Sequence, residues 1–126
     1  MKYLKESESP KEVFDAPYKR TIRHIISPWT TGSEHIWLGT STVEPGFSSN
    51  YHSHEDLEET FYCIQGKGQI RVDGEVVDVE INDVVYVKPG ELHQLINPSD
   101  TEMFKLVCVV TPPFTPTNFS SAHTPK

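Results

Sequence analysis

Two histidines separated by a single residue, His52 and His54, are the side chains of this sequence best suited to hold a metal ion. Successive side chains of an extended strand alternate between its two faces, so residues two positions apart project to the same side. Both imidazoles can therefore reach one ion. A carboxylate could join them from Glu58 or Glu59, but these neighbours have opposite strand parity, so only one of them can face the histidines.

A third histidine, His93, follows a turn at Pro89-Gly90 and opens a later run of strand-forming residues. It can reach the same interior from a different strand. Three imidazoles and one carboxylate suit one divalent transition metal, and we expect iron, manganese, nickel or zinc. In an octahedral shell this set leaves about two positions open to water or a substrate.

The elements that must position these side chains are strands. Short runs of β-branched and aromatic residues recur between turn residues from position 21 onward, which is typical of an all-β sandwich or barrel. Asp73-Gly74 is the clearest hairpin turn, because both residues tolerate a positive φ. The expected strands are Thr21–Ile26, His35–Val43, Glu59–Gln65, Gly68–Val72, Val76–Ile81, Val84–Val87, His93–Ile96 and Glu102–Thr111.

The chain of 126 residues has the size of one domain, with an N-terminal arm (1–20), a barrel (21–111) and a C-terminal tail rich in Pro, Thr and Ser (112–126). The arm is charged and contains two prolines, so neither end is expected to supply much core. Both segments could instead cover the exposed edge strand of a second copy, and we therefore expect a homodimer.

The spacing of the candidate ligands resembles the first motif of the cupin family. Gly46, five spacers, His52-x-His54, four spacers, Glu59, six spacers and Gly66 reproduce that motif in full. Only Glu59 stands six spacers before the last glycine, so the resemblance gives the ligand role to Glu59 and not to its neighbour.

The second motif of the family is matched by Gly90, His93 and Asn97. The sequence departs from it twice, since Asn82 stands where the family has Gly and Lys88 where it has Pro. Both departures concern turn geometry rather than metal binding, because Asn also accepts a left-handed conformation. The resemblance implies a double-stranded β-helix, the small RmlC-like jelly-roll barrel.

Several other side chains lie on strands that would flank the site and are candidate walls of a substrate pocket. They are Trp37, Phe61, Cys63, Tyr86, Leu106 and Cys108. The two cysteines are expected as buried free thiols, although the sequence leaves a disulfide open. The other histidines, His24, His35 and His123, have no partner at ligand spacing, so we expect them at exposed polar strand edges and outside the site.

Composition limits the classes of partner. The formal net charge is −7 and Lys and Arg form no cluster, so a phosphate backbone would be repelled and nucleic acid is not an expected partner. No segment is apolar enough to cross a bilayer, and the N-terminal run lacks the apolar core of a signal peptide. We expect a cytoplasmic protein that does not bind membranes.

An ion held by this set keeps a net local charge of about +1, which favours small molecules with adjacent oxygens. Such ligands include hydroxy and keto acids, diketones, polyketides and sugar derivatives. We expect a metal-dependent enzyme with isomerase, lyase or dioxygenase chemistry, and the alternative is a non-catalytic small-molecule binder. The sequence does not identify a catalytic acid or base, and the fold does not choose among these reactions.

Overall fold

The computed structural model describes residues 1–123, which are built mainly from strands. The elements in chain order are a 3-10 turn η1 (Glu6–Glu8), β1 (Lys11–Phe14), β2 (Arg20–Ile26), β3 (Trp37–Val43), β4 (Glu58–Gln65), β5 (Gly68–Val72), β6 (Glu75–Val79), β7 (Val84–Val87), β8 (His93–Ile96), β9 (Phe104–Thr111) and a helix α1 (Pro116–His123). Within this range no helix is long and apolar enough to cross a membrane.

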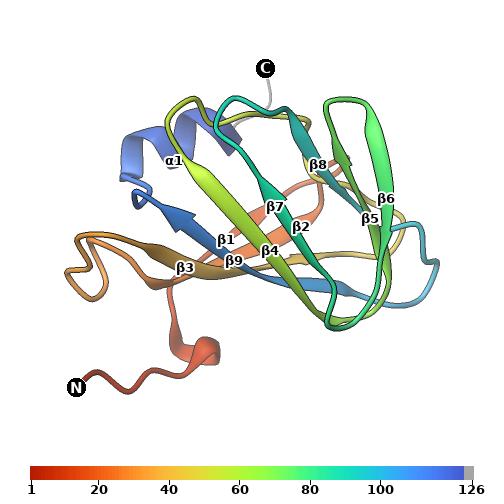
Figure 1. The fold of residues 1–126 in the computed structure, drawn as a ribbon. Helices are drawn as coiled ribbons and strands as arrows, with labels where there is room; N and C mark the ends of the chain where they lie inside the picture. The colour runs from red at the N-terminus through yellow and green to blue at the C-terminus, as the bar shows by residue number, and fades with distance from the viewer. Residues whose placement is uncertain (124–126) are drawn as a thin grey trace.

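The strands form two antiparallel sheets around one core (Figure 1). The larger sheet has the order β1-β2-β3-β9-β4-β7 and the smaller one the order β6-β5-β8. Buried side chains of both sheets, such as Phe61 and Leu106 from the larger and Ile70 and Leu95 from the smaller, belong to the same hydrophobic cluster. The expected jelly-roll barrel is confirmed.

The side chains of β4 and β9 alternate between the barrel interior and the outside, as the two-residue period of a strand requires. Along β4, Glu59, Phe61 and Cys63 are buried whereas Glu58 and Tyr62 are exposed. Glu59 is therefore held on the inner face by the same register that buries the two apolar side chains after it. A shift of one residue would turn this carboxylate outward.

The turns adopt the backbone conformations expected from their residue types. Asp73 and Gly74 both have positive φ, at 45° and 86°, and join β5 to β6 in a tight hairpin. Asn82, which replaces the usual Gly of the second motif, has φ 77°. Asn97 is buried and holds the turn before β9, because its amide nitrogen donates to the backbone oxygens of Val43 and Glu102.

The two ends of the chain are more ordered than a charged arm and a polar tail suggest. The arm contains β1, which pairs with β2 from Lys11 opposite Arg23 to Phe14 opposite Arg20. The expectation that neither end supplies core is wrong for the C-terminal segment, since Phe114 is only 1% exposed and Phe119 on α1 is also buried. Two well-spaced aromatic residues are enough to anchor a segment whose other residues are mostly polar.

The C-terminal helix lies across one end of the barrel (Figure 1). It adjoins the loop before β4, because Asn118, Ser121 and Ala122 line the same surface groove as residues 53–57 of that loop. The hydrogen bond from the side-chain amide of Asn50 to the backbone oxygen of Ala122, 3.1 Å long, ties the helix to the barrel. This end of the barrel is therefore covered by the segment that the sequence predicts as a tail.

Gly39 on β3 allows a close approach that positions one wall of the site. A Cβ atom at this glycine would lie 2.1 Å from the backbone oxygen of Arg23 and 2.4 Å from the ring of Trp37. We expect Gly39→Ala to lower the free energy of unfolding by about 1–3 kcal/mol, the cost of overpacking a core. Urea denaturation measures this, with Thr42→Val on the half-buried face of the same strand as a near-neutral control. An Ala variant as stable as the wild type would contradict this close packing.

Candidate metal centre

His52 and His93 are brought face to face by the backbone. The two residues form an isolated antiparallel bridge in which His52 N donates to His93 O at 3.1 Å and His93 N donates to His52 O at 2.7 Å. The segment that carries the first motif thus runs beside β8, which carries the second. Two histidines that lie far apart in the sequence become neighbours through hydrogen bonds that do not depend on their side chains.

The ring orientations of these two histidines are fixed by main-chain oxygens. Nδ1 of His52 lies 2.9 Å from the oxygen of Asn50, and Nδ1 of His93 lies 3.0 Å from the oxygen of Glu91. A carbonyl oxygen can only accept, so each Nδ1 carries the proton and the lone pair is on Nε2. Second partners of this kind set the tautomer and aim of metal-binding histidines.

Three buried polar atoms converge at one point and lack hydrogen-bond partners among the described residues. Oε1 of Glu59 lies 3.3 Å from Nε2 of His54 and 3.2 Å from Nε2 of His93, and none of these three atoms makes a hydrogen bond. Ligand atoms that share one ion at bonds of about 2.1 Å lie roughly 3 Å apart. Buried polar atoms without partners are rare, so their gathering here fits a site for a cation.

His52 completes this group, which we call the metal cluster: His52, His54, Glu59 and His93. The nitrogen ligand atoms of the three histidines all lie within 4.8 Å of one another. All four side chains are buried. The exposed neighbour Glu58 instead accepts a hydrogen bond from the Tyr86 hydroxyl on the outer surface.

The charges of the metal cluster suit cation binding. Burial, together with the nearby His93 and Arg20, lowers the pKa of His52 well below its usual value, so this imidazole is neutral at pH 7. Burial raises the pKa of Glu59, but His54 and His93 outweigh this effect and hold the pKa of the carboxyl well below its ordinary value. Burial also lowers the pKa of His93, yet the Glu59 carboxylate outweighs it and raises that pKa. Metal binding at His93 therefore competes with protonation of this imidazole and weakens as the pH falls.

Acid should destabilise the chelator-treated protein already at pH values well above those at which carboxyl groups usually titrate. Burial lowers the pKa values of His52 and His123 well below normal, so both stay neutral in the fold while the unfolded chain binds protons below about pH 6.5. Their contribution to stability is present above pH 6.5 and is lost as pH falls towards the folded values. We expect a loss of up to about 1.4 kcal/mol per pH unit for each histidine.

Urea denaturation in EDTA at pH 6.5, 6.0, 5.5 and 5.0 measures this slope. His123→Asn should reduce it, whereas His35→Asn should not, because His35 is exposed. The raised pKa of His93 acts in the opposite direction, so the comparison of variants decides: equal slopes in the wild type and His123→Asn would contradict a neutral His123.

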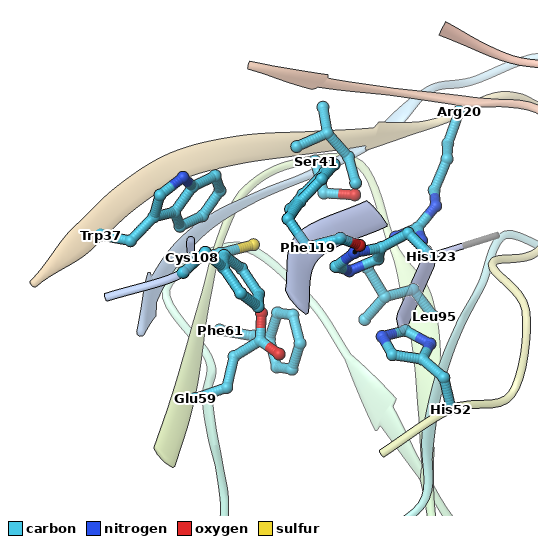
Figure 2. A pocket seen from close by; sticks show the side chains of 12 residues that line it. Arg20, Trp37, Ser41, His52, Glu59, Phe61, Leu95, Cys108, Phe119 and His123 are labelled. Atoms are coloured by element: carbon cyan, nitrogen blue, oxygen red, sulfur yellow. Dashed lines mark hydrogen bonds between the residues drawn. The ribbon is translucent and has the colours of Figure 1, made fainter. Parts of the chain in front are cut away.

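A small cavity adjoins the metal cluster on its inner side (Figure 2). Its volume is about 10 Å³, which is room for about one water molecule. Of the six wall candidates from the sequence, Trp37, Phe61 and Cys108 line it. Its other lining residues are Arg20, Ile22, Ser41, His52, Glu59, Leu95, Phe114, Phe119 and His123.

The remaining wall candidates lie elsewhere. Tyr86 is 51% exposed and faces outward from β7, so its assignment to the pocket is wrong. Its strand shows no alternation of polar and apolar residues, so the inner face of this strand could not be predicted. Cys63 and Leu106 face inward but pack within the core and do not line the cavity. Both cysteines are buried free thiols, as expected.

Two histidines expected at exposed edges are buried, and only His35 is exposed as predicted. His24 is covered by β1, where its Nε2 lies 2.9 Å from a carboxylate oxygen of Glu12, and its Nδ1 accepts from Trp37 Nε1 at 3.1 Å. His123 is 4% exposed, and its ring centroid lies 4.8 Å from that of His52. Both corrections follow from terminal segments that fold over the barrel, which strand patterns could not reveal.

Comparison with known proteins identifies the architecture. The family model described as "Cupin domain" matches residues 39–110, more than half of the chain. The chain belongs to the cupin family. The matched span contains all four residues of the metal cluster but neither Arg20 nor the C-terminal helix.

The proteins to which this cupin is similar differ in their named functions. It is 27% identical over 93 residues to the uncharacterized protein MJ1618 of Methanocaldococcus jannaschii, which covers 74% of each chain. It is 31% identical over 77 residues to the tetracenomycin polyketide synthase protein TcmJ of Streptomyces glaucescens, which covers 61% of this cupin and 52% of that protein. A predicted oxalate decarboxylase of Thermotoga maritima has the same fold, with a TM-score of 0.76 at 22% identity over 87% of this cupin and 98% of that chain.

Proposed function

We propose that this cupin is a metal-dependent enzyme that acts on a small, oxygen-rich molecule, with one divalent transition-metal ion held by His52, His54, Glu59 and His93. The observation that carries the proposal is the convergence of His54 Nε2, Glu59 Oε1 and His93 Nε2 without hydrogen-bond partners among residues 1–123. Iron, manganese, nickel and zinc all accept imidazole and carboxylate ligands.

A metal ion in this cluster would supply Lewis-acid chemistry, or with iron a site for dioxygen, towards a molecule that offers adjacent oxygens. The protein's own residues supply the setting. Neutral His52 and ionised Glu59 offer lone pairs, and their main-chain and side-chain contacts hold them in place. Trp37, Phe61 and Phe114 make the inner wall apolar and so restrict access by water.

The names of two similar proteins support an oxygen-rich substrate. One is named as a polyketide synthase protein and another as a predicted oxalate decarboxylase. Polyketides and oxalate both carry oxygens on neighbouring or alternate carbons. Isomerase, lyase and dioxygenase chemistry all act on such molecules, and the identity of the reaction stays a prediction.

Elemental analysis of protein purified without added metal, followed by turnover assays, tests the proposal. We expect about one transition-metal ion per chain and consumption of a hydroxy acid, keto acid or diketone by the loaded protein. Parallel assays under air and under argon separate dioxygenase chemistry from lyase or isomerase chemistry. A loaded protein that binds such molecules and consumes none is a non-catalytic binder, the alternative function. A protein that takes up none of the four metals would overturn the proposal.

The homodimer expected from the exposed edge strands also stays a prediction. Light scattering coupled to size-exclusion chromatography measures it directly. A mass of twice the 14.3 kDa chain is the expected result, and a monomer at all concentrations would contradict it.

A further inference from the structure

Arg20, the first residue of β2, is a buried cation without an ionic partner in residues 1–123. It is 3% exposed, and none of the ion pairs within 4.0 Å involves it. Its side chain donates one hydrogen bond, 3.3 Å long, to the side-chain oxygen of Asn50, and its guanidinium carbon lies 5.3 Å from the ring centre of Phe14. A buried charge of this kind is unfavourable unless something pairs with it.

The unsatisfied part of Arg20 belongs to the inner cavity. The side chain extends from β2 to the cavity beside His123 (Figure 2). Its Nε–H is buried and has no acceptor among the described residues. Burial lowers the pKa of Arg20 to about 10, so the guanidinium still carries its charge at neutral pH.

Ser41 on the neighbouring strand β3 presents a second unsatisfied group to the same cavity. Its Oγ is buried and has no hydrogen-bond partner in the described structure. Ser41 pairs with Ile22 across the sheet, and Ile22 lies two residues after Arg20 on β2. The side chains of Arg20 and Ser41 therefore both lie on the inner face. One cavity thus contains a cationic donor and a neutral donor, each lacking an acceptor.

These donors and the metal cluster border a common space. The cavity is lined by Arg20 and Ser41 and also by His52 and Glu59 of the cluster. The Glu59 carboxylate borders the same cavity and favours the charged form of Arg20, but no ion pair within 4.0 Å joins the two, and its Oε1 lies 3.3 Å from His54 Nε2 and 3.2 Å from His93 Nε2. A guanidinium fork and a hydroxyl are the donors that proteins use to bind carboxylates.

We propose that Arg20 and Ser41 form a carboxylate subsite, so that this cupin selects small 2-oxo or 2-hydroxy carboxylic acids over neutral diketones. The inference rests on the proposed function, because the 2-oxo or 2-hydroxy oxygen of the same molecule would face the metal cluster. The carboxylate itself accepts hydrogen bonds from Arg20 Nε–H and Ser41 Oγ–H. Neutral molecules of the same shape would leave the buried guanidinium unpaired.

Entry of such an acid requires movement of the C-terminal helix. The cavity holds about one water, and Phe119 and His123 of α1 are among its walls. On the outer side, a groove of about 330 Å³ runs between the loop before β4 and α1 and is lined by His54, which also belongs to the metal cluster. An outward shift of α1 would join this groove to the cavity.

Pyruvate and 2,3-butanedione are suitable probes because both carry a keto group. Beside it pyruvate has a carboxylate, whereas 2,3-butanedione has a second, neutral methyl ketone. Each is titrated calorimetrically into metal-loaded and metal-free protein. We expect pyruvate to bind at least about 10-fold more tightly than the diketone, the effect of one charged hydrogen bond. Arg20→Gln should remove this preference by weakening the binding of pyruvate about 10-fold or more, and the variant should still take up the metal.

Arg23→Gln is the matched control, since Arg23 lies on the same strand with its side chain directed to the oxygens of Ser7 and Ser9. It should keep the preference for pyruvate. If Arg20→Gln does not fold, Arg20→Lys and Ser41→Ala replace it, and each should weaken pyruvate binding about 10-fold or more.

The outcomes separate this inference from the proposed function. Equal affinities for the two probes, or a preference that survives in the Arg20 and Ser41 variants, would overturn the carboxylate subsite even if metal binds. A preference for pyruvate that depends on Arg20 in a protein that takes up no metal would support the subsite and overturn the metal-dependent function instead.

Discussion

Glu59→Ala lowers the affinity of this cupin for a divalent metal ion by about 100-fold or more, whereas Glu58→Ala leaves it unchanged. Four ligands of a protein zinc site together contribute about 10–16 kcal/mol, so one ligand corresponds to roughly 3 kcal/mol, or about 100-fold. The two residues are adjacent in β4, but Glu59 is buried against His54 and His93 while Glu58 is exposed.

Competition with a chelator of known affinity measures this difference, and circular dichroism checks that both variants fold. The pair is a stringent control because both substitutions remove one carboxylate from the same strand. Equal losses in the two variants would indicate that general negative charge, and not the inward carboxylate, attracts the metal. No loss in Glu59→Ala would remove this residue from the cluster.

Phe114→Ala lowers the free energy of unfolding by about 3–5 kcal/mol, the usual cost of removing a fully buried phenylalanine side chain. The ring is 1% exposed and its centroid lies 5.0 Å from that of Trp37 and 5.1 Å from that of His54. Loss of the ring leaves a void beside the metal cluster and under the C-terminal helix. The effect is large because contacts from both the barrel and the helix are lost together.

Urea denaturation of the metal-free protein gives the difference in stability. Phe47→Ala makes the same chemical change at a partly buried residue that packs on the edge of the core, and should cost less than about 2 kcal/mol. If Phe114→Ala were no more destabilising than this control, the C-terminal segment would not be part of the folded core.

The strands of the barrel could be predicted well because their signals are local. Gly68–Val72, Val84–Val87 and His93–Ile96 have the bounds expected from the sequence. The other expected strands are present with ends that differ by one or two residues, where pairing with a neighbour decides the last hydrogen bond. The short strand β1 was not expected, because it has only four residues, two of them charged, and pairing with β2 makes it a strand.

Three of the six wall candidates line the cavity, and the other three fail for two different reasons. A strand pattern gives the face on which a side chain lies but not its depth along the barrel. Leu106 shares a face with Cys108, yet only the latter reaches the cavity. For Tyr86, even the face was ambiguous, because its neighbours on β7 are all apolar.

By itself, the sequence determined the strands of the barrel and the common face of His52 and His54, because spacing within strands fixes which side chains share a face. The choice of Glu59 over Glu58 came from the resemblance to the cupin motif, since strand parity left both open. Only the tertiary structure decided that Arg20, Ser41 and His123 surround the same cavity. These residues come from β2, β3 and a helix in the polar C-terminal segment, and their proximity depends on how distant segments pack. Local periodicity carries no information about such packing, and so the surroundings of the site could be read only from the fold.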